Sequence, residues 1–198
     1  MSKPILIVLF IVFCNSSLIS QNKFFSNLYF PNSYGLCMPI NNNYLRNSAV
    51  LSNEFEYRFE NKTPIFIRIS IDNSTFQFEI PINNRTNVLK SELKVNSYYF
   101  GFGFKKKFEK FRFTGQLQIG ELEFKYPIIN TLSNNIEVDF LKDKYVSFKT
   151  CLGLEYYIFD DFAFLIEAFY SISPSSNIFC KSNYQTVGLK FGITTTLF

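Results

Sequence analysis

The stretch that decides the fold is VSFKTCLGLEYYIFDDFAFLIEAFY, which occupies residues 146–170. Val146, Phe148 and Leu152 fall on alternate positions, and the residues between them are mostly polar or small. An alternation with a period of two is typical of a β-strand with one apolar and one polar face. The pattern breaks at 158–161 and resumes over 162–170. This stretch therefore predicts two strands joined by a tight turn.

The same alternation covers most of the chain. It recurs over residues 51–60, 65–72, 97–104, 111–119 and 187–197. Seven strands are thus predicted, each of roughly ten residues, which is about the length that a tilted strand needs to cross a bilayer. An eighth strand is expected between Phe25 and Met38, where Pro31 disturbs the pattern. No linker is apparent, so residues 21–198 are predicted to form one domain.

The composition favours strands and argues against a nucleic-acid partner. The chain has 26 Phe and 12 Tyr but no Trp, and aromatic side chains lie well on the pleated surface of a sheet. The net charge of +4 comes from 20 basic and 16 acidic residues that are dispersed along the sequence. A nucleic-acid footprint would require a concentrated basic patch.

The N-terminus has the features of a secretory signal. Lys3 supplies a positive charge, and an unbroken apolar run follows over residues 5–13, which is too short to span a bilayer. Cys14 raises the question of a lipoprotein signal. A lipid-modified cysteine needs a small residue before it, and here Phe13 precedes Cys14, which argues against lipid modification. We expect cleavage after Ser20, which makes residues 1–20 a signal peptide.

The connections between the predicted strands alternate in length. Tight turns are expected at 61–64, 105–110 and 158–161, and long connections at 72–94, 121–144 and 171–183. Barrels of bacterial outer membranes have short periplasmic turns and long external loops, so this is the order expected for them. A membrane protein without spanning helices must close into a barrel to satisfy its backbone. The apolar faces are therefore expected to point outwards, into lipid.

The chain resembles the small eight-stranded bacterial outer-membrane barrels, such as the OmpA transmembrane domain, OmpX and PorT-like proteins. The resemblance is carried by VGLKFGI, residues 187–193, and by the terminal Phe198. In that family the barrel-assembly machinery reads an amphipathic last strand that ends in an aromatic residue. Here Phe198 directly follows Leu197 and so falls off the apolar register. The resemblance implies an all-β fold, an eight-stranded antiparallel up-and-down transmembrane β-barrel in the cell outer membrane. It also implies outer-membrane lipid around the barrel and the assembly machinery as a partner during biogenesis.

Two alternatives stay open at this point. A soluble exported, lipocalin-like binding barrel would show the same alternation with its apolar face inwards. The other alternative is an outer-membrane enzyme without histidine. The chain has no His, which excludes a Ser-His-Asp triad and the His-dependent zinc sites. The outer-membrane deacylases, palmitoyl transferases, phospholipases and omptin-type proteases rely on a His. By resemblance, therefore, the chain is expected to be none of these enzymes. No catalytic, cofactor-binding or metal-binding residue is predicted, and a structural or surface-interaction role without catalysis is expected.

Outward apolar faces leave the charged residues of the strands inside the barrel. Glu54 and Glu56 could act as a pair of acid–base groups there. A structural network of ion pairs is favoured instead, because side chains fill the lumen of an eight-stranded barrel and buried charges must be paired. The same packing argues against a permanent pore. Five acidic and five basic side chains are predicted in the lumen: Glu54, Glu56, Arg58, Arg68, Asp72, Arg112, Lys149, Glu155, Glu167 and Lys190.

Two of the long connections continue the alternation before it breaks. They are expected to form β-ribbons beyond the membrane, with tips at Asn83-Asn84 and Asn134-Asn135. Strand edges that protrude in this way can pair with a strand of another protein. A protein partner at these external hairpins is the one positive indication of function in the sequence.

Three cysteines remain after cleavage at Ser20, in a compartment that permits disulfides. Cys37 is expected near the upper end of the first strand and Cys180 in the loop before the last strand, and closure of the barrel makes these strands neighbours. A Cys37–Cys180 bridge is therefore predicted, with Cys151 free and pointing into the lumen. Three unpaired thiols are the alternative.

Overall fold

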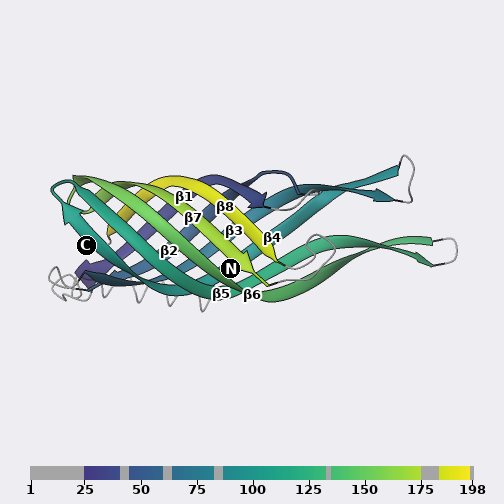
Figure 1. Cartoon of the computed structure of the whole chain (residues 1–198), viewed down its shortest axis with the longest axis horizontal. Helices are drawn as coiled ribbons and strands as arrows, with labels where there is room; N and C mark the ends of the chain where they lie inside the picture. Colours follow the sequence, from purple (N-terminus) through teal and green to yellow (C-terminus); the bar gives the residue numbers. More distant parts are fainter. Residues whose placement is uncertain are drawn as a thin grey trace, which may run out of the picture.

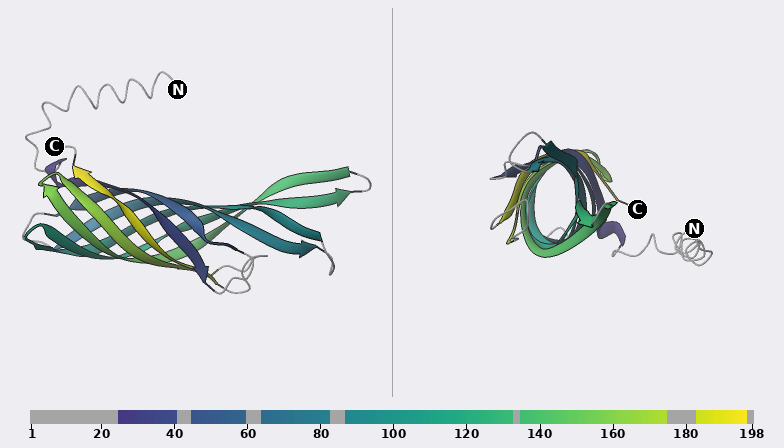
Figure 2. Two further views of the ribbon diagram at one scale, coloured as in Figure 1. Left: turned by 90° about the horizontal axis from the view of Figure 1, so that it is seen from above. Right: turned by 90° about the vertical axis from the view of Figure 1, so that its right-hand side faces the viewer.

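The strands of this protein form one closed barrel in chain order, from β1 to β8, in a computed structural model of the chain (Figure 1). Every neighbouring pair is antiparallel, and β1 closes the barrel by pairing with β8. A view along the barrel shows the closed cross-section (Figure 2). The predicted eight-stranded up-and-down barrel is confirmed. The structure describes residues 25–40, 45–59, 64–82, 87–132, 135–174 and 183–196, so the predicted signal peptide, 1–20, lies outside the described residues.

All seven predicted strands are present, and the expected eighth is β1. Pro31 lies within β1 and has no N–H to donate. The β1–β2 ladder accordingly skips Phe30 and Pro31 and resumes at Asn32. A 3-10 turn, Phe25–Asn27, precedes the barrel. In the described ranges no helix is long and apolar enough to cross a membrane. The strands are β1 (Leu28–Ile40), β2 (Ser48–Arg58), β3 (Ile65–Ile82), β4 (Asn87–Phe108), β5 (Phe111–Leu132), β6 (Asn135–Phe159), β7 (Phe162–Ser173) and β8 (Tyr184–Thr196).

The outer face of the barrel is apolar and its inner face is polar. On β4 the outward apolar positions run from Tyr98 to Phe108, a span that matches the length of a membrane-crossing strand. A soluble lipocalin-like barrel would have its apolar face inside, so that alternative is wrong. Each strand contributes an exposed apolar side chain to the outer band, for example Leu36, Phe55, Ile69, Phe100, Leu117, Phe148, Ile166 and Leu189.

The apolar alternation changes phase towards one end of the barrel. On β3 the odd positions from Ile65 to Ile71 are apolar and point outwards, whereas Phe76 and Phe78 occupy even positions and are buried. On β5 the outward Ile119 is followed by the inward Phe124. Removing an apolar side chain from water is favourable. Where water replaces lipid around the strand, the apolar residues therefore occupy the inward positions instead of the outward ones. The change of phase therefore marks one border of the apolar band.

Beyond this border two β-ribbons leave the barrel. Strands β3 to β6 have 18 to 25 residues, whereas the other four have 11 to 13. Ribbon β3–β4 and ribbon β5–β6 project from one end, and β8 ends at the opposite end (Figure 2). The long connections predicted at 72–94 and 121–144 are thus mostly strand, as the expectation of ribbons requires. Of the predicted tips, Asn83, Asn84 and Asn134 lie outside the described residues, and Asn135 begins β6.

Two of the three connections at the other end are shorter than predicted; the third, predicted at 61–64, lies between the end of β2 at Arg58 and the start of β3 at Ile65, and residues 60–63 are outside the described residues. The turn expected at 105–110 consists of Glu109 and Lys110 alone, because Lys105 still pairs with Thr114 on β5. Glu109 adopts a φ of 51°, which a two-residue hairpin demands at its first turn position when the turn is of the primed kind. The turn expected at 158–161 likewise shrinks to its two aspartates, because β6 continues to Phe159.

Candidate functional site

The barrel interior holds all ten of the charged side chains predicted for it. Each of them is 7% exposed or less. They lie on alternate positions of β2, β3, β5, β6, β7 and β8, opposite in phase to the apolar outer face. They divide into a central ring and two flanking groups, one towards the short-turn end and one towards the ribbon end.

The central ring consists of four alternating charges from four strands. Arg68 Nη1 lies 2.6 Å from Glu54 Oε2 and 2.7 Å from Glu167 Oε2. Lys190 Nζ lies 3.0 Å from Glu54 Oε1 and 2.7 Å from Glu167 Oε1. Each carboxylate therefore contacts both cations, and each cation contacts both carboxylates. Gln116 donates a further hydrogen bond of 3.1 Å to Glu167.

A second group lies towards the short-turn end and is organised around Arg58. The Arg58 guanidinium pairs with both Glu56 and Glu155 and lies 3.7 Å from the centre of the Tyr29 ring. The Tyr157 hydroxyl donates a 2.7 Å hydrogen bond to Glu155 and accepts hydrogen bonds from Arg58 and Arg112. This group joins the central ring through Glu56, which also accepts a hydrogen bond of 2.7 Å from Arg68 Nε.

The third group lies towards the ribbon end. Lys149 Nζ is 2.7 Å from Asp72 Oδ2, and its charge also lies 5.2 Å from the centre of the Tyr99 ring. Ser52 links this pair to the ring, because its hydroxyl donates to Asp72 and accepts a 3.1 Å hydrogen bond from Lys190. Every predicted acid thus meets a predicted base, and the ten charges form one connected network.

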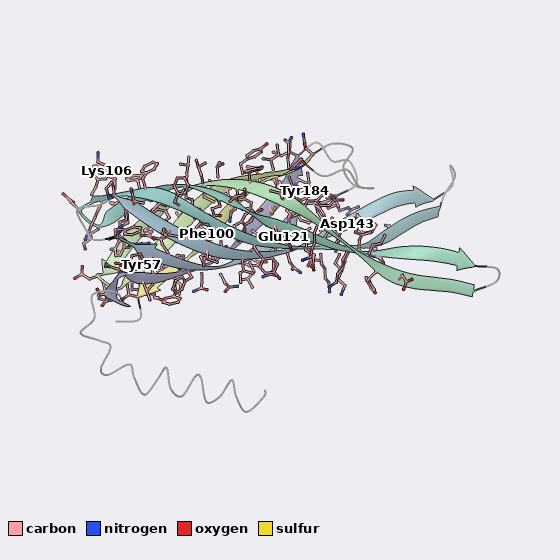
Figure 3. The ribbon with its side chains drawn as sticks, turned by 90° about the horizontal axis from the view of Figure 1, so that it is seen from below. Tyr57, Phe100, Lys106, Glu121, Asp143 and Tyr184 are labelled. Atoms are coloured by element: carbon pink, nitrogen blue, oxygen red, sulfur yellow. The ribbon has the colours of Figure 1, made fainter. Side chains whose placement is uncertain are left out.

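Above the network the lumen is closed by an apolar plug. The rings of Phe124 and Tyr184 meet edge to face with their centres 4.9 Å apart, and Phe76 packs against Tyr184 from the other side at 6.2 Å. Figure 3 labels Tyr184 near the level at which the ribbons leave the barrel. Sequence reasoning missed the plug, although the change of phase between Ile71 and Phe76 was its signal. The plug consists of Phe76, Phe78, Leu93, Val95, Leu122, Phe124 and Tyr184, with Leu45 and Tyr145 beside them.

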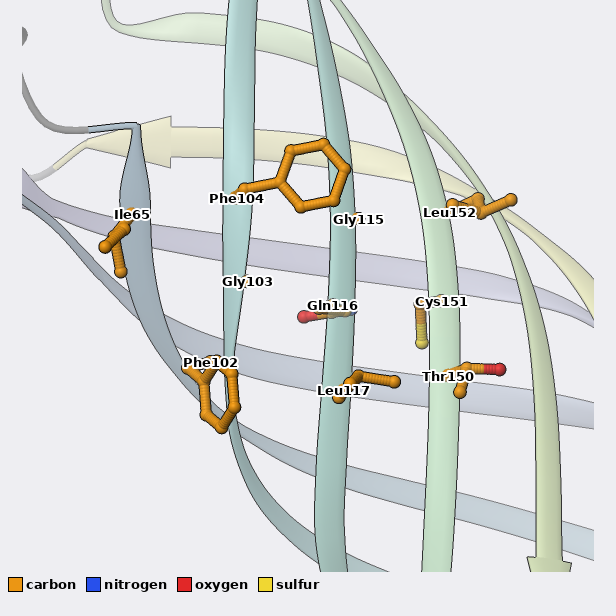
Figure 4. A pocket seen from close by; sticks show the side chains of 10 residues that line it. All are labelled: Ile65, Phe102, Gly103, Phe104, Gly115, Gln116, Leu117, Thr150, Cys151 and Leu152. Carbon is orange, nitrogen blue, oxygen red and sulfur yellow. The ribbon is translucent and has the colours of Figure 1, made fainter.

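Little space remains inside the barrel. A lumen cavity bordered by Asp72, Tyr99 and Lys149 has a volume of about 20 Å³, enough for about one water molecule. A larger depression, of about 570 Å³, lies over Gly103 and Gly115 (Figure 4). Because Gly115 has no side chain, the Phe104 ring lies over it, where a Cβ atom would come within 2.7 Å of the ring. Apolar side chains dominate this depression, and it has the character of a lipid-facing surface and not of a reaction site.

The interior offers little for chemistry. In the described part of the chain, no three His, Cys, Asp or Glu side chains are grouped so that they could hold a metal ion. Cys37 and Cys151 are free, buried thiols on the inner faces of β1 and β6 and do not pair with each other. Cys180 lies outside the described residues, so the Cys37–Cys180 bridge stays a prediction.

Comparisons with known proteins identify the architecture. Neisserial surface protein A (NspA) matches with a TM-score of 0.58 and 9% identity, over 87% of this chain and 98% of that one. OprG of Pseudomonas aeruginosa matches with a TM-score of 0.60 and 8% identity, over 86% and 95%. The fold is that of the small eight-stranded outer-membrane barrels. The attachment invasion locus protein Ail of Yersinia pestis has a TM-score of 0.50 and 17% identity, over 85% and 99%. No protein-family model and no curated protein sequence matches the chain.

Proposed function

We propose that this protein is a closed outer-membrane anchor that holds two β-ribbons outside the cell for contact with a partner protein. Its membrane residence is supported by the apolar outer band and by the fold that it shares with outer-membrane proteins. The direction of insertion follows from the short turns at one end and the ribbons at the other, since such barrels place short turns in the periplasm. The barrel-assembly machinery would act on β8, the amphipathic last strand.

The observation that carries the proposal is the contrast between a filled lumen and extended ribbons. In the described part of the chain the ion-pair network and the plug occupy the interior, and the lumen cavity beside Lys149 has a volume of about 20 Å³, too small for a substrate. The strands β3 to β6 nevertheless continue well past the border of the apolar band. Strands of 11 to 13 residues suffice at the other four positions of the barrel, so closure does not require the extra length of the ribbons, and an isolated two-stranded hairpin is at best marginally stable in water. Their surface is the part of the molecule that is available for function.

The ribbons present the kind of surface that a β-strand partner recognises. The ladder between β4 and β5 ends at the pair Lys94 and Lys125, and beyond this pair the two ribbons separate (Figure 1). Residues 45 and 46 still pair with β3 at Gln77 and Phe78; beyond that point the described part of ribbon β3–β4 is two-stranded, as ribbon β5–β6 is beyond Lys125. A two-stranded ribbon exposes strand edges that can pair with an incoming strand. The proposed partner is therefore a protein that offers an extended segment at the cell surface.

Site-directed crosslinking and ribbon shortening test this role. A photo-crosslinking amino acid is placed at Glu92 on ribbon β3–β4, or at Lys106 in the short-turn end as the matched control, and intact cells are irradiated. We expect a crosslinked protein from Glu92 and none of the same mass from Lys106. Replacing residues 79–90 by Asn-Gly joins Phe78 to Ser91, which are cross-strand partners, through a tight hairpin. The crosslink from a neighbouring position, Gln77, should then be lost, and its persistence would contradict a role for the ribbon.

A further inference from the structure

A gap opens between the two ribbons, and it is closed at its base. The ladder between β4 and β5 ends at the pair Lys94 and Lys125, and beyond this pair each ribbon keeps only its own ladder (Figure 1). The edges of β4 and β5 therefore face each other across the gap. A strand that enters the gap from the tips can run only as far as the Lys94–Lys125 pair, where it has to end or turn.

The directions of the backbone groups show that the edge of β4 can receive a strand. The N–H group of Lys105 donates to the carbonyl of Pro64 on the β3 side, and successive residues of a strand direct their N–H groups to opposite sides. The registers of β4 with β3 and with β5 run without a shift. The even-numbered residues of β4 therefore direct N–H and C=O towards β5. Beyond Lys94, where β5 has left the ladder, these groups of Glu92 face the gap.

The facing edge of β5 is less suited to a new strand. Tyr157 donates its N–H to the carbonyl of Lys110, which places the even-numbered residues of β5 on the β6 side and the odd-numbered ones on the β4 side. Pro127 therefore faces the gap with a nitrogen that carries no hydrogen. Proline in this position protects a strand edge against pairing. Strand β4 contains no proline, so its edge keeps all its donors.

A depression on the outer face lies beside the β4 edge at the base of the gap. It has a volume of about 420 Å³. Pro127 and Phe140 are cross-strand partners there, and Lys125 Nζ lies 5.3 Å from the centre of the Phe140 ring. The depression thus combines ammonium groups with a small apolar wall. Its border consists of Ser91, Glu92, Lys94, Lys125, Pro127 and Phe140.

The two lysines at the base leave an excess of positive charge there. Opposite residues on one face have their Cβ atoms about 4.5–5.5 Å apart, and like charges in such positions destabilise a sheet. No ion pair of the described residues includes Lys94 or Lys125, and Glu123 lies 4.0 Å from Lys142 instead. Glu92 lies two residues farther out along β4. The charges therefore favour one negative group at the base and disfavour a second one farther out.

We infer that the gap between the ribbons binds the C-terminal end of an extended protein segment, with its last residue at the base. This inference rests on the proposed function and names the part of the partner that the ribbons hold. The segment pairs with β4, and its terminal carboxylate meets the ammonium groups of Lys94 and Lys125. Pro127 and Phe140 contact the side chain of its last residue, which is therefore apolar. An internal segment would have to turn at the base, and an N-terminus would add a third ammonium group to the two lysines.

Two pools of N-acetylated random heptapeptides test the inference, one ending in a free carboxylate and the other in an amide. The purified protein in a neutral detergent is incubated with each pool, and mass spectrometry counts the retained peptides. We expect the wild type to retain at least tenfold more peptide from the carboxylate pool, with apolar last residues enriched. K94Q/K125Q should lose this preference. The charge-preserving K94R/K125R should keep it, as should K106Q/K107Q, which removes two exposed lysines from the short-turn end.

The pairing with β4 is tested separately at Glu92. Glu92→Pro removes an N–H group that faces the gap and leaves the donors to β3 in place, whereas Glu92→Gln keeps this N–H group. Retention of the carboxylate pool should fall at least fivefold in Glu92→Pro and stay within twofold of the wild type in Glu92→Gln. A gel shift between boiled and unboiled samples shows that each variant is folded.

The outcomes separate this inference from the proposed function. Retention of neither pool, equal retention of both pools by the wild type, or an equal loss of preference in K106Q/K107Q would overturn the carboxylate site. Equal retention by Glu92→Pro and Glu92→Gln would overturn the pairing with β4. If the crosslink from Glu92 forms in cells although the two pools are retained equally, the ribbons hold a partner by another part of its chain. In that case the inference fails and the proposed function stands.

Discussion

Lys190 of β8 and Glu54 of β2 meet inside the barrel, with Nζ 3.0 Å from Oε1, although 136 residues separate them in the sequence. Strand β1 lies between their strands, so this contact spans the seam at which the barrel closes. Together with Arg68 and Glu167 they form the ring of alternating charges. The ring can form only when β8 has joined β1, which couples the pairing of buried charges to closure.

Removing one member of the ring should therefore destabilise the closed barrel. In Lys190→Met, Glu54 and Glu167 each lose one of their two cationic partners while they stay buried. Breaking a buried pair in this way costs about 3–5 kcal/mol. Urea unfolding in lipid vesicles should show a clearly lower midpoint for Lys190→Met and an unchanged midpoint for the exposed control Lys106→Met. Equal midpoints for the two variants would contradict the structural role of the ring.

The apolar plug should contribute to stability as a protein core does. Phe124 is fully buried against Tyr184 and Tyr145, whereas Phe140 is 63% exposed on the outer face of β6. Truncation of a buried Phe to Ala costs about 3–5 kcal/mol. Phe124→Ala should lower the free energy of unfolding by about that amount, and Phe140→Ala by less than about 1 kcal/mol. Similar losses in both variants would show that the ribbon end is not packed as described.

The filled lumen should not conduct ions steadily. Arg68 and Lys190 bridge the interior, and the cavity beside Lys149 has room for about one water molecule. Protein reconstituted into a planar bilayer is expected to give no stable current of porin size. Such a current at a protein-to-lipid ratio that yields single insertions would refute the closed lumen.

A tyrosine at the base of ribbon β5–β6 should titrate late. Burial, and the 2.8 Å hydrogen bond that Tyr126 donates to Asp143, raise the pKa of Tyr126 to about 12. Because this pKa lies above the ordinary value of about 10, the contact stabilises the ribbon fully below pH ~10 and is lost as the pH rises towards ~12. The difference between the ultraviolet titration curves of the wild type and of Tyr126→Phe should show one phenolate transition near pH 12. If this difference instead shows its transition near pH 10, the contact is absent.

The sequence was sufficient for the fold because the outer band imposes a period of two on every strand. Strand β1 was the least certain, since Pro31 removes a ladder donor and breaks the pattern. The set of inward charges could be predicted, but their pairing could not. That Lys190 meets Glu54 across the closing seam, in addition to Glu167 on the neighbouring strand, depends on the stagger of the closed sheet. The pairing of Lys94 with Lys125 could not be predicted for the same reason, because only the register of the sheet brings these two residues together.

Labelling of single cysteines in whole cells tests the central claim, that the barrel crosses the outer membrane with its ribbons outside. In a background with Cys180→Ser, the remaining Cys37 and Cys151 are buried. New cysteines replace Glu92 on a ribbon, Phe100 in the apolar band, or Lys106 at the short-turn end, and cells receive a membrane-impermeant maleimide. We predict labelling of Glu92→Cys in intact cells, of Lys106→Cys only after the outer membrane is opened, and of Phe100→Cys in neither case. Labelling of Lys106→Cys in intact cells, or recovery of all three variants as soluble protein, would contradict the account.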